Sequence, residues 1–456
     1  MKYDAIIIGS GQAGNPLSES LTDQGLQVAL IEKAHLGGTC INTGCTPTKT
    51  MVASAQVAYY ARNAKRWGVR TGRVSVDLPR IVERKNNIVQ QFRGGKESGI
   101  ERRRTVRLYR GHARFVGPHE VQVGGEVLET ERIFINTGTR TDVPSLEGLD
   151  QVESLTNATI MELKKLPKHL LVLGGGYIGL EFGQMFRRFG SRVTVIHRSD
   201  LILGREDADV AAELQKALEA DGLRFELNAR TTRVEKKRGR IVLTVETPSG
   251  TKRTSGSHLL VATGRRPNTD DLALEKAGVE TDKRGFIKVN GKLETNVPGI
   301  WALGDVKGGP AFTHISYNDY QIVYANLIEG KNLTIDRRIV PYSVFTDPQL
   351  GRVGMTEKEA RETGRKLKIG KVPMSWVARA IERDETAGFM KLIADADSDR
   401  ILGAAILATE GGELIQILSA LMYAGAPYTV LKGAVYIHPT LAEGFFSLME
   451  SVKSET

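Results

Sequence analysis

The segment Tyr3-Asp4-Ala5-Ile6-Ile7-Ile8-Gly9-Ser10-Gly11-Gln12-Ala13-Gly14 decides how the chain folds. Its apolar run reads as a buried strand, and three glycines follow in the spacing G-x-G-x-x-G. A helical stretch broken at Gly25 comes next, and a second strand-like run over residues 27–31 ends in Glu32. Strand, glycine loop, helix and strand in this order predict a Rossmann-type unit that binds a dinucleotide.

The same arrangement recurs in the middle of the chain. Residues 169–173 read as a strand, Gly174-Gly175-Gly176-Tyr177-Ile178-Gly179 forms the loop, and a strand over residues 192–196 leads to His197. The last loop glycine stands at 14 and 179 and the strand-end residue at 32 and 197, so the spacing is identical in the two copies. This repeat predicts two Rossmann units rather than two glycine-rich turns in ordinary α/β units.

Each glycine of the loop has its own physical task. The first makes the tight turn, the second lets the backbone approach a pyrophosphate, and the third lets the helix pack on the strand. The free N–H groups at the helix N-terminus then face the phosphates. The positions are Gly9, Gly11 and Gly14 in the first copy and Gly174, Gly176 and Gly179 in the second.

The residues that end the second strand differ between the copies, and the difference predicts two ligands. Glu32 can accept hydrogen bonds from a ribose with free hydroxyls, which suits the adenosine of FAD. The second unit instead has His197 and Arg198, followed by Arg205. Guanidinium groups bind a 2′-phosphate that a carboxylate would repel, so NADPH is favoured and NADH is less favoured. The alternative is that both arginines are solvated surface charges.

The segment Gly37-Gly38-Thr39-Cys40-Ile41-Asn42-Thr43-Gly44-Cys45-Thr46-Pro47-Thr48-Lys49 contains both cysteines of the chain. It follows the first dinucleotide unit directly, so we expect it near the ligand of that unit. Residues 51–63 read as a helix, and we expect both cysteines at its N-terminal end, where the helix dipole would stabilise a thiolate. Two cysteines cannot complete a four-ligand zinc site, and a disulfide across so short a loop stabilises a fold little. We therefore expect redox chemistry, with a small staple or a partial metal site as the alternatives.

Composition limits the other possibilities. The 456 residues are 41% apolar, but no apolar run approaches the roughly 18–20 residues of a membrane span. The N-terminus lacks the pattern of a signal peptide, so we expect a soluble, cytoplasmic protein. The net charge of +10 suits a solubilising surface or attraction of anionic ligands. The basic clusters at 102–104 and 236–238 match no nucleic-acid motif, so neither nucleic acid nor a membrane is an expected partner.

Three motifs give the chain a resemblance to a known family over essentially its whole length. They are the G-G-T-C-x4-C-x-P-x-K segment at 37–49, the segment T-N-V-P-G-I-W-A-L-G-D at 295–305, and His438-Pro439-Thr440 with Glu443. The chain resembles the class I pyridine nucleotide–disulfide oxidoreductases, which include glutathione reductase, dihydrolipoyl dehydrogenase and mercuric reductase.

The resemblance implies roles for the residues of the cysteine segment. Cys45 would be the charge-transfer thiol beside the flavin, and Cys40 the interchange thiol that meets the substrate. Lys49 would lie near the flavin and pair with Glu181, because a buried lysine without a partner would be costly. Tyr177 would gate the nicotinamide pocket. The alternative for Tyr177 and Glu181 is a place on the helix surface.

The resemblance also implies that the C-terminal domain dimerises. His438 would then reach the cysteines of the partner chain, with Glu443 orienting the ring. A histidine suits this task because its ordinary pKa of about 6.5 lets it exchange protons near neutrality. The alternative is that His438-Pro439 is simply a turn.

The expected ligand-binding residues form two sets. The FAD set comprises Gly9, Gly11, Gly14, Glu32, Lys33, Gly38, Thr39, Thr137, Gly138, Gly304 and Asp305, of which Asp305 would hold the ribityl chain. The NADPH set comprises Gly174, Gly176, Gly179, His197, Arg198, Arg205 and Gly264. No structural metal is expected, although Cys40 and Cys45 are candidate contacts for a substrate metal ion.

The expected fold class is α/β, with two Rossmann-like dinucleotide-binding domains, for FAD and NAD(P), and a C-terminal α+β dimerisation domain. The segments are an FAD-binding domain at 1–147, an NAD(P)H-binding domain at 148–270, a return to the FAD domain at 271–338, and the C-terminal domain at 339–456. Gly138 and Gly264 mark the crossings between the two dinucleotide-binding domains.

The expected function is that of an FAD-dependent oxidoreductase working through the Cys40–Cys45 pair. Residues 312–320 and 340–347 look most like a subgroup near mercuric reductase that includes the reactive-chlorine-resistance copper(II) reductase. An NADPH-dependent reductase of Hg(II)- or Cu(II)-type ions is therefore favoured, although the tail at 445–456 lacks the cysteine pair of mercuric reductase. The alternatives are a reductase of low-molecular-weight disulfides, a dihydrolipoyl dehydrogenase, and a flavin-bearing binding protein without enzymatic activity.

Overall fold

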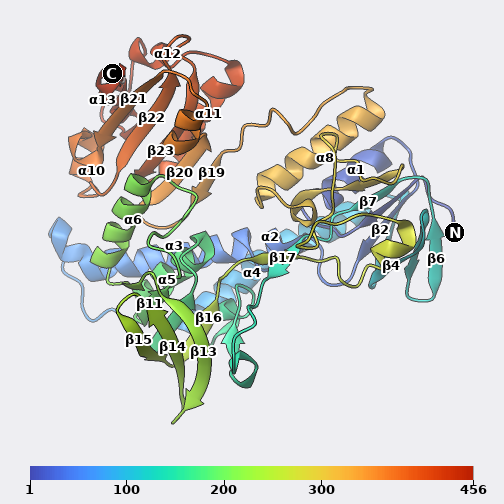
Figure 1. Cartoon of the computed structure of the whole chain (residues 1–456), viewed down its shortest axis with the longest axis horizontal. Coiled ribbons are helices and arrows are strands. Elements are labelled where there is room, and N and C mark those ends of the chain that lie inside the picture. The colour runs from blue at the N-terminus through green and yellow to red at the C-terminus, as the bar shows by residue number, and fades with distance from the viewer. Residues whose placement is uncertain (455–456) are drawn as a thin grey trace.

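A computed structural model describes residues 1–454 of the chain. Three lobes are visible in Figure 1: the first dinucleotide unit, drawn mainly in blue, cyan and yellow, the second in green, and a C-terminal domain in orange and red. The last two residues of the predicted C-terminal domain, 455–456, lie outside the described part of the chain.

The first lobe is built on a parallel sheet whose central strands are apolar and buried. The strand order is β18 (Ile300–Ala302), β7 (Ile133–Ile135), β1 (Ala5–Ile8), β2 (Val28–Glu32) and β3 (Val106–Arg110). Strand β1 pairs in register with β2, Ile8 opposite Ile31, so Gly9 and Glu32 emerge at the same edge of the sheet. Helix α1 (Gly14–Asp23) starts at the last glycine of the loop. The carboxyl edge of the sheet therefore brings together the residues that were predicted to bind one dinucleotide.

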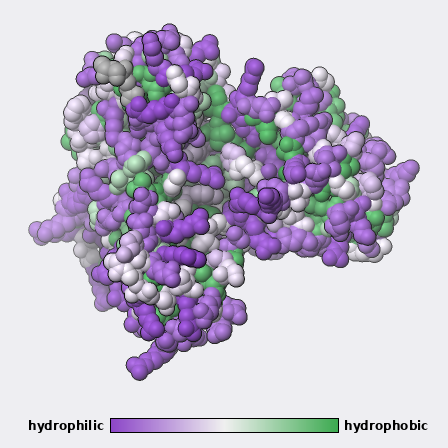
Figure 2. Space-filling model, viewed as in Figure 1, coloured by the Kyte–Doolittle hydropathy of each residue, from purple (hydrophilic) through white to green (hydrophobic). Residues whose placement is uncertain are grey.

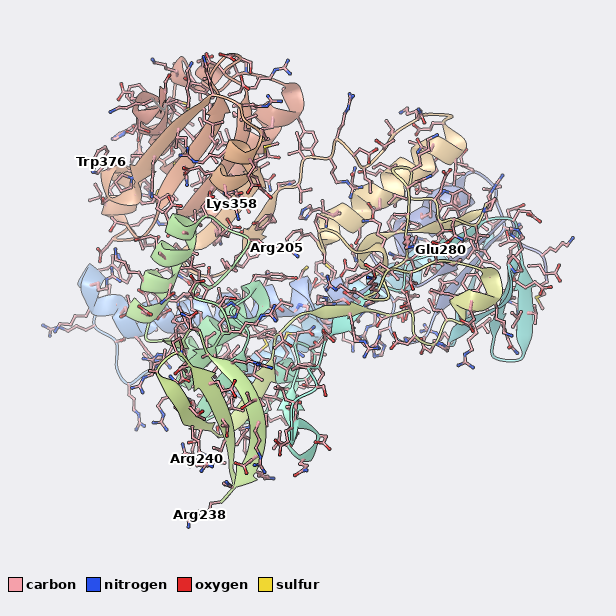
Figure 3. The ribbon with its side chains drawn as sticks, viewed as in Figure 1. Arg205, Arg238, Arg240, Glu280, Lys358 and Trp376 are labelled. Carbon is pink, nitrogen blue, oxygen red and sulfur yellow. The ribbon has the colours of Figure 1, made fainter. Side chains whose placement is uncertain are left out.

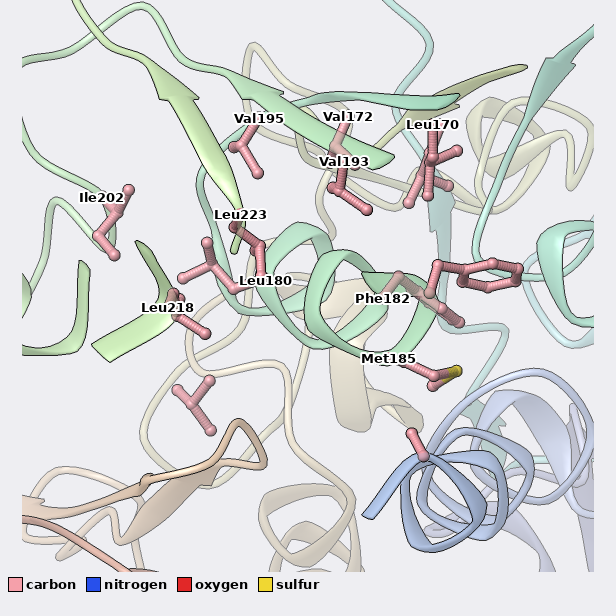
Figure 4. Close-up of a cluster of buried hydrophobic side chains, with 14 of the residues drawn as sticks. Leu170, Val172, Leu180, Phe182, Met185, Val193, Val195, Ile202, Leu218 and Leu223 are labelled. Carbon is pink, nitrogen blue, oxygen red and sulfur yellow. The ribbon is translucent and has the colours of Figure 1, made fainter. Parts of the chain in front are cut away.

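The second lobe repeats this plan. The strand order is β12 (Arg224–Glu226), β11 (Arg192–Ile196), β10 (His169–Leu173), β16 (His258–Val261) and β9 (Ser154–Leu155). Helices α5 (Tyr177–Phe189) and α6 (Ala208–Ala220) accompany the sheet, and a second sheet contains β13 (Arg230–Lys237), β14 (Arg240–Thr247) and β15 (Gly250–Gly256). Figure 4 shows Leu180 and Phe182 of α5 beneath Val172, Val193 and Val195 of the parallel strands.

The C-terminal domain is an antiparallel sheet with helices. The strand order is β19 (Tyr342–Val344), β20 (Gln349–Gly354), β23 (Ile401–Ala408), β22 (Phe389–Asp395), β21 (Leu367–Pro373) and β24 (Lys453–Ser454). Helices α11 (Gly411–Ala424) and α13 (Gly444–Ser451) contribute Leu414, Leu418, Phe445 and Leu448 to its core. The predicted fold class is confirmed: two parallel-sheet Rossmann-like domains followed by an antiparallel α+β domain.

The other elements connect these lobes. The remaining helices are α2 (Gly38–Asn42), α3 (Cys45–Asn63), α4 (Leu78–Glu101), α7 (Leu274–Ala277), α8 (Thr313–Ile328), α9 (Glu357–Glu362), α10 (Ala378–Glu382) and α12 (Thr429–Lys432), with 3-10 turns at Ala64–Trp67, Leu149–Gln151, Ile160–Glu162, Gly304–Lys307, Met374–Trp376 and Leu441–Glu443. The remaining strands are β4 (Ala113–Gly117), β5 (Glu120–Val123), β6 (Glu126–Glu129), β8 (Thr139–Thr141) and β17 (Arg265–Pro267). Strands β8 and β17 pair with each other directly after Gly138 and Gly264, where the crossings between the units were predicted. The domain boundaries themselves stay predictions.

The surface of the molecule is mostly hydrophilic, as Figure 2 shows for one face. Within residues 1–454, no helix combines the length and the apolar character that crossing a bilayer requires.

Candidate active site

The first glycine loop has a geometry that only glycines tolerate. Gly9 has φ +101°, and a Cβ atom there would lie 2.4 Å from the Asn136 carbonyl oxygen. A Cβ atom on Gly14 would lie 2.0 Å from the Gly9 carbonyl oxygen. The Gly14 N–H donates to Oδ1 of Asn136 over 2.9 Å, which fixes the start of α1 against strand β7. The loop is therefore held tightly, with its helix N-terminus directed along the sheet edge where a pyrophosphate would bind.

The second loop repeats these contacts almost atom for atom. Gly174 has φ +108°, and its Cβ atom would lie 2.4 Å from the Ala262 carbonyl oxygen. A Cβ atom on Gly179 would lie 2.3 Å from the Gly174 carbonyl oxygen, whereas Gly176 has open space around it. A backbone that is open at the second glycine lets a phosphate approach closely.

The strand-end residues of the two units are engaged differently. Glu32 accepts hydrogen bonds from the N–H and the hydroxyl of Ser10 at 3.0 and 2.7 Å, which locks the carboxylate beside the first loop. His197 accepts a hydrogen bond from the Gly175 N–H over 3.1 Å, and burial lowers the pKa of its imidazole. A neutral imidazole with Nδ1 as acceptor is the form that this contact requires.

The two arginines of the second unit are exposed. Among the described residues, neither Arg198 nor Arg205 has an ion-pair partner. Figure 3 shows Arg205 on the segment between β11 and α6, close to the C-terminal domain. Both guanidinium groups are thus available to an anionic ligand.

The two cysteines occupy different helices, which corrects one expectation. Helix α3 begins at Cys45, six residues before the predicted start, and Cys40 lies in the short helix α2 rather than at the N-terminal end of the same helix. Gly44, with φ −131° and ψ −118°, separates the two helices. Pro47 is tolerated because the N–H groups of the first helical turn have no partner within the helix. The dipole of α3 therefore acts on Cys45 in particular.

The surroundings of the two cysteines give their thiols different pKa values. The pKa of Cys45 is lowered to about 6, chiefly by a hydrogen bond from the Cys40 thiol. Thr313 and Lys49 also lower this pKa, whereas burial opposes the shift. The same bond, together with burial, holds the pKa of Cys40 far above its ordinary value. The Thr313 hydroxyl lies 3.1 Å from Sγ of Cys45. In the dithiol form, Cys45 is therefore the thiolate and Cys40 the thiol.

Lys49 and Glu181 meet as the resemblance implied. Nζ of Lys49 lies 2.6 Å from Oε2 of Glu181, whose side chain is only 4% exposed. The other carboxylate oxygen of Glu181 accepts the N–H of Phe345 over 2.9 Å. This ion pair joins α3 to α5, and so joins the cysteine helix to the second dinucleotide unit.

A cavity of about 1010 Å³ adjoins these groups and the first glycine loop. Its lining includes residues of the predicted FAD set, namely Gly9, Gly11, Glu32, Lys33, Gly38, Thr39, Thr137, Gly138 and Asp305, together with Cys40, Cys45, Lys49, Tyr177 and Glu181. The Thr137 hydroxyl is buried there without a hydrogen-bond partner in the described chain, which suits a polar ligand. The Asp305 carboxylate accepts the Thr139 hydroxyl over 2.8 Å. The cavity has the size and the polar groups that FAD requires.

Several predicted residues lie beside the cavity rather than along it. Gly14 is buried at the start of α1, and Gly304 is packed against Asn136 and Ser316. The glycines of the second loop, His197 and Arg198 of the NADPH set lie directly after strands β10 and β11, whereas Arg205 lies farther along, before α6. Gly264 accepts a hydrogen bond from the Asp142 N–H at the crossing between the units.

Tyr177 occupies the first position of α5 and is largely enclosed. Its ring centroid lies 6.2 Å from that of Phe312, and burial raises the pKa of its hydroxyl. Tyr177 therefore stands between the second glycine loop and the cavity, at the place where a gate is expected.

His438 and Glu443 pair with each other but not with the cysteines of their own chain. Nδ1 of His438 lies 2.9 Å from Oε1 of Glu443, and the imidazole is 68% exposed on the C-terminal domain. Neither residue lines the cavity that holds Cys45.

Sequence reasoning missed three residues near the cysteines and the first loop. Asn136 anchors Gly14, Thr313 contacts Cys45, and Phe312 packs against Tyr177. Asn136 stands directly before the predicted Thr137 and Gly138, which is a usable signal. Thr313 and Phe312 contact segments that are distant in the sequence, and the residues around them give no sign of these contacts.

We predict that alkylation of the reduced protein by iodoacetamide will report a Cys45 pKa near 6. In a Cys40→Ser variant, Cys45 is the only cysteine left and the hydroxyl can still donate, so the pH midpoint should stay well below the ordinary thiol value of about 8.5. In Cys40→Ala the donor is lost, and the midpoint should move upward. Equal midpoints in the two variants, or a midpoint near 8.5 in both, would contradict the assignment of Cys45 as the thiolate.

Comparison with known proteins identifies the family. The model for the family "Pyridine nucleotide-disulphide oxidoreductase" matches residues 3–319, and the model for its dimerisation domain matches residues 340–448. The probable pyridine nucleotide-disulfide oxidoreductase RclA of Escherichia coli is 39% identical over 99% of this chain and 100% of its own length. A mercuric reductase of Lysinibacillus sphaericus is 37% identical over 97% and 81%. A dihydrolipoyl dehydrogenase of Thermus scotoductus is 36% identical over 99% and 98%.

A solved structure supports the same identification. The Cu(II) complex of the HOCl-induced flavoprotein disulfide reductase RclA from Escherichia coli superposes with a TM-score of 0.90, at 38% identity, over 99% of each chain. The chain therefore belongs to the pyridine nucleotide-disulphide oxidoreductase family and is an FAD-dependent oxidoreductase enzyme that uses a pyridine nucleotide.

Proposed function

We propose that this protein is an NADPH-dependent reductase of soft metal ions, of the Cu(II) or Hg(II) type, that works through Cys40 and Cys45. The observation that carries the proposal is the pair itself: two thiols of unequal acidity that line one cavity, which suits a flavin. Thiolates are the protein ligands that soft ions prefer. Relatives described as a mercuric reductase and as a Cu(II) complex of a flavoprotein reductase support this class of substrate.

FAD and NADPH, when bound, supply the hydride and electron transfer. The chain would hold FAD with the first glycine loop, the Glu32 carboxylate toward the adenosine ribose and Asp305 toward the ribityl chain. Lys49, fixed by Glu181, would place a positive charge near the flavin ring. These residues would bind the cofactor and orient it beside the cysteines.

NADPH rather than NADH is part of the proposal. The second unit lacks an acidic residue at the strand end, and within residues 1–454 neither Arg198 nor Arg205 has an ion-pair partner. Two free guanidinium groups favour a ligand with a 2′-phosphate, whereas an NAD-binding unit uses a carboxylate at that place.

A homodimer is also part of the proposal. The exposed His438, oriented by Glu443 at 2.9 Å, would reach the partner's cysteines and hold or release the proton of the Cys40 thiol. The matching dimerisation domain at 340–448 supports this arrangement. A cytoplasmic location is proposed because a cysteine pair that works in its reduced form suits a reducing compartment.

A second candidate function is the reduction of a low-molecular-weight disulfide or of lipoamide. The His438–Glu443 pair favours it, because thiol–disulfide exchange needs a group that takes and returns protons. Cys40 would attack the substrate disulfide as a thiolate while Cys45 stays beside the flavin. The 36% identity to a dihydrolipoyl dehydrogenase is a further ground for testing lipoamide.

A Cys45→Ser variant should keep its flavin but lose NADPH-driven turnover by about a hundredfold or more. Initial rates with Cu(II), Hg(II), oxidised glutathione and lipoamide as separate acceptors measure this loss and rank the two candidate functions. Ala53→Ser adds a hydroxyl to the exposed side of the same helix and should leave the rates unchanged. Full turnover in Cys45→Ser with every acceptor would refute the role of the pair.

The kcat/KM for NADPH should exceed that for NADH by about tenfold or more. Arg198→Ala should lower the ratio of these two values, because it weakens the binding of NADPH and not that of NADH. Arg238→Ala is the control, because this exposed residue lies at the tip of the β13–β14 hairpin, far from Arg205 in Figure 3. A preference for NADH, or equal narrowing in both variants, would count against NADPH as the electron donor.

A further inference from the structure

Tyr342 connects the C-terminal domain to the segment that carries Arg205. It lies on β19 directly opposite Arg352 of β20, so both side chains lie on the same face of the sheet. The Tyr342 hydroxyl donates a hydrogen bond to Oε1 of Glu206, and Nη1 of Arg352 lies 3.7 Å from the other oxygen of that carboxylate. The residue next to Arg205 is therefore held by the C-terminal domain.

Glu206 and Arg205 are neighbours in sequence but face different surroundings. The Glu206 side chain is 2% exposed, whereas Arg205 is exposed and has no ion-pair partner in the described chain. Asp207, the next residue, is likewise turned inward, where it contacts Arg352 at 3.3 Å and accepts the N–H of Glu357 at 2.9 Å. Two acidic residues thus follow Arg205 without neutralising it.

The inward position of Glu206 depends on few contacts. Within residues 1–454, Oε2 of Glu206 has no hydrogen bond. In that part of the chain the carboxylate receives one hydrogen bond, from Tyr342, and the longer ion pair with Arg352. A buried carboxylate that loses its hydrogen bond is destabilised and turns toward water or toward another cation. The exposed cation next to it in the chain is Arg205.

We propose that Tyr342 is a specificity-determining positioning residue for the dinucleotide. Its hydroxyl keeps Glu206 away from Arg205, so that the Arg205 guanidinium stays free to bind the 2′-phosphate of NADPH. A carboxylate that turned outward would pair with Arg205 and repel the phosphate. NADH lacks that phosphate and would be little affected. The inference rests on the proposed use of NADPH and adds the residue that protects its binding site.

The ring of Tyr342 allows the hydroxyl to be tested separately. It stacks on Phe312 with centroids 5.1 Å apart and an interplanar angle of 11°, and Phe312 in turn contacts Tyr177. A phenylalanine at position 342 keeps this stack and removes only the hydrogen bond. Tyr342→Phe therefore leaves the aromatic wall of the cavity in place.

The test is the equilibrium binding of NADP⁺ and NAD⁺ to the oxidised, FAD-loaded enzyme, measured by titration calorimetry. Tyr342→Phe should weaken the binding of NADP⁺ by about tenfold and leave the binding of NAD⁺ unchanged. An ionised carboxylate near the 2′-phosphate repels NADP⁺, whereas NAD⁺ has no phosphate at that position. The double variant Tyr342→Phe/Glu206→Gln should restore NADP⁺ binding, since glutamine carries no charge to compete. Tyr60→Phe is the matched control: it removes a tyrosine hydroxyl that bonds Glu385 over 2.6 Å, at a different contact with the C-terminal domain.

The outcomes separate this inference from the proposed function. If Arg205→Ala weakens the binding of NADP⁺ but Tyr342→Phe does not, the role of Tyr342 is wrong and the proposed use of NADPH is still supported. If Arg205→Ala leaves NADP⁺ binding unchanged, the assignment of the phosphate site is wrong and the inference falls with it. The role of Tyr342 would also be overturned if Tyr342→Phe weakened the binding of NADP⁺ and NAD⁺ equally, or if adding Glu206→Gln did not restore the binding of NADP⁺. A general structural role of Tyr342 predicts these two results.

Discussion

The ion pair between Lys49 and Glu181 is the contact on which the arrangement of the site depends. It links the helix that begins with Cys45 to the helix that begins with Tyr177. Glu181 is buried, and an unpaired carboxylate in that position would be strongly disfavoured, so the two helices are held in one register. The thiols and the second dinucleotide unit therefore keep a fixed relation although they come from different lobes.

The same region gives the two cysteine thiols different acidities although the side chains are identical. Cys40 and Cys45 differ in acidity because one donates the hydrogen bond that the other accepts, and because Cys45 opens a helix. Thr313 and Lys49 are the neighbours that favour the thiolate of Cys45. The role of the Cys40 thiol toward an acceptor stays a prediction. The difference in acidity therefore arises from the surroundings of the two residues, because the side chains themselves are identical.

Much of the fold followed from local sequence because each Rossmann loop is constrained by its own backbone. Gly9 and Gly14, like Gly174 and Gly179, leave no room for a Cβ atom, and such constraints appear as a fixed glycine spacing. The start of α3 was misplaced because Pro47 reads as a helix breaker although it is compatible with a first turn. The Cys45–Thr313 and Glu206–Tyr342 contacts join segments more than a hundred residues apart, so no local pattern indicates them. The roles of His438 and of the arginines came from the family resemblance and from charge, and they stay predictions.

The central claim is that electrons from the nucleotide come to rest on the cysteine pair, and thiol counting after anaerobic addition of an equimolar amount of NADPH to the oxidised, FAD-loaded enzyme tests it most directly. Our account predicts that both cysteines of each chain become reactive toward a thiol reagent while the flavin absorbance returns to its oxidised form. A flavin that stays bleached while no new thiol appears would contradict it.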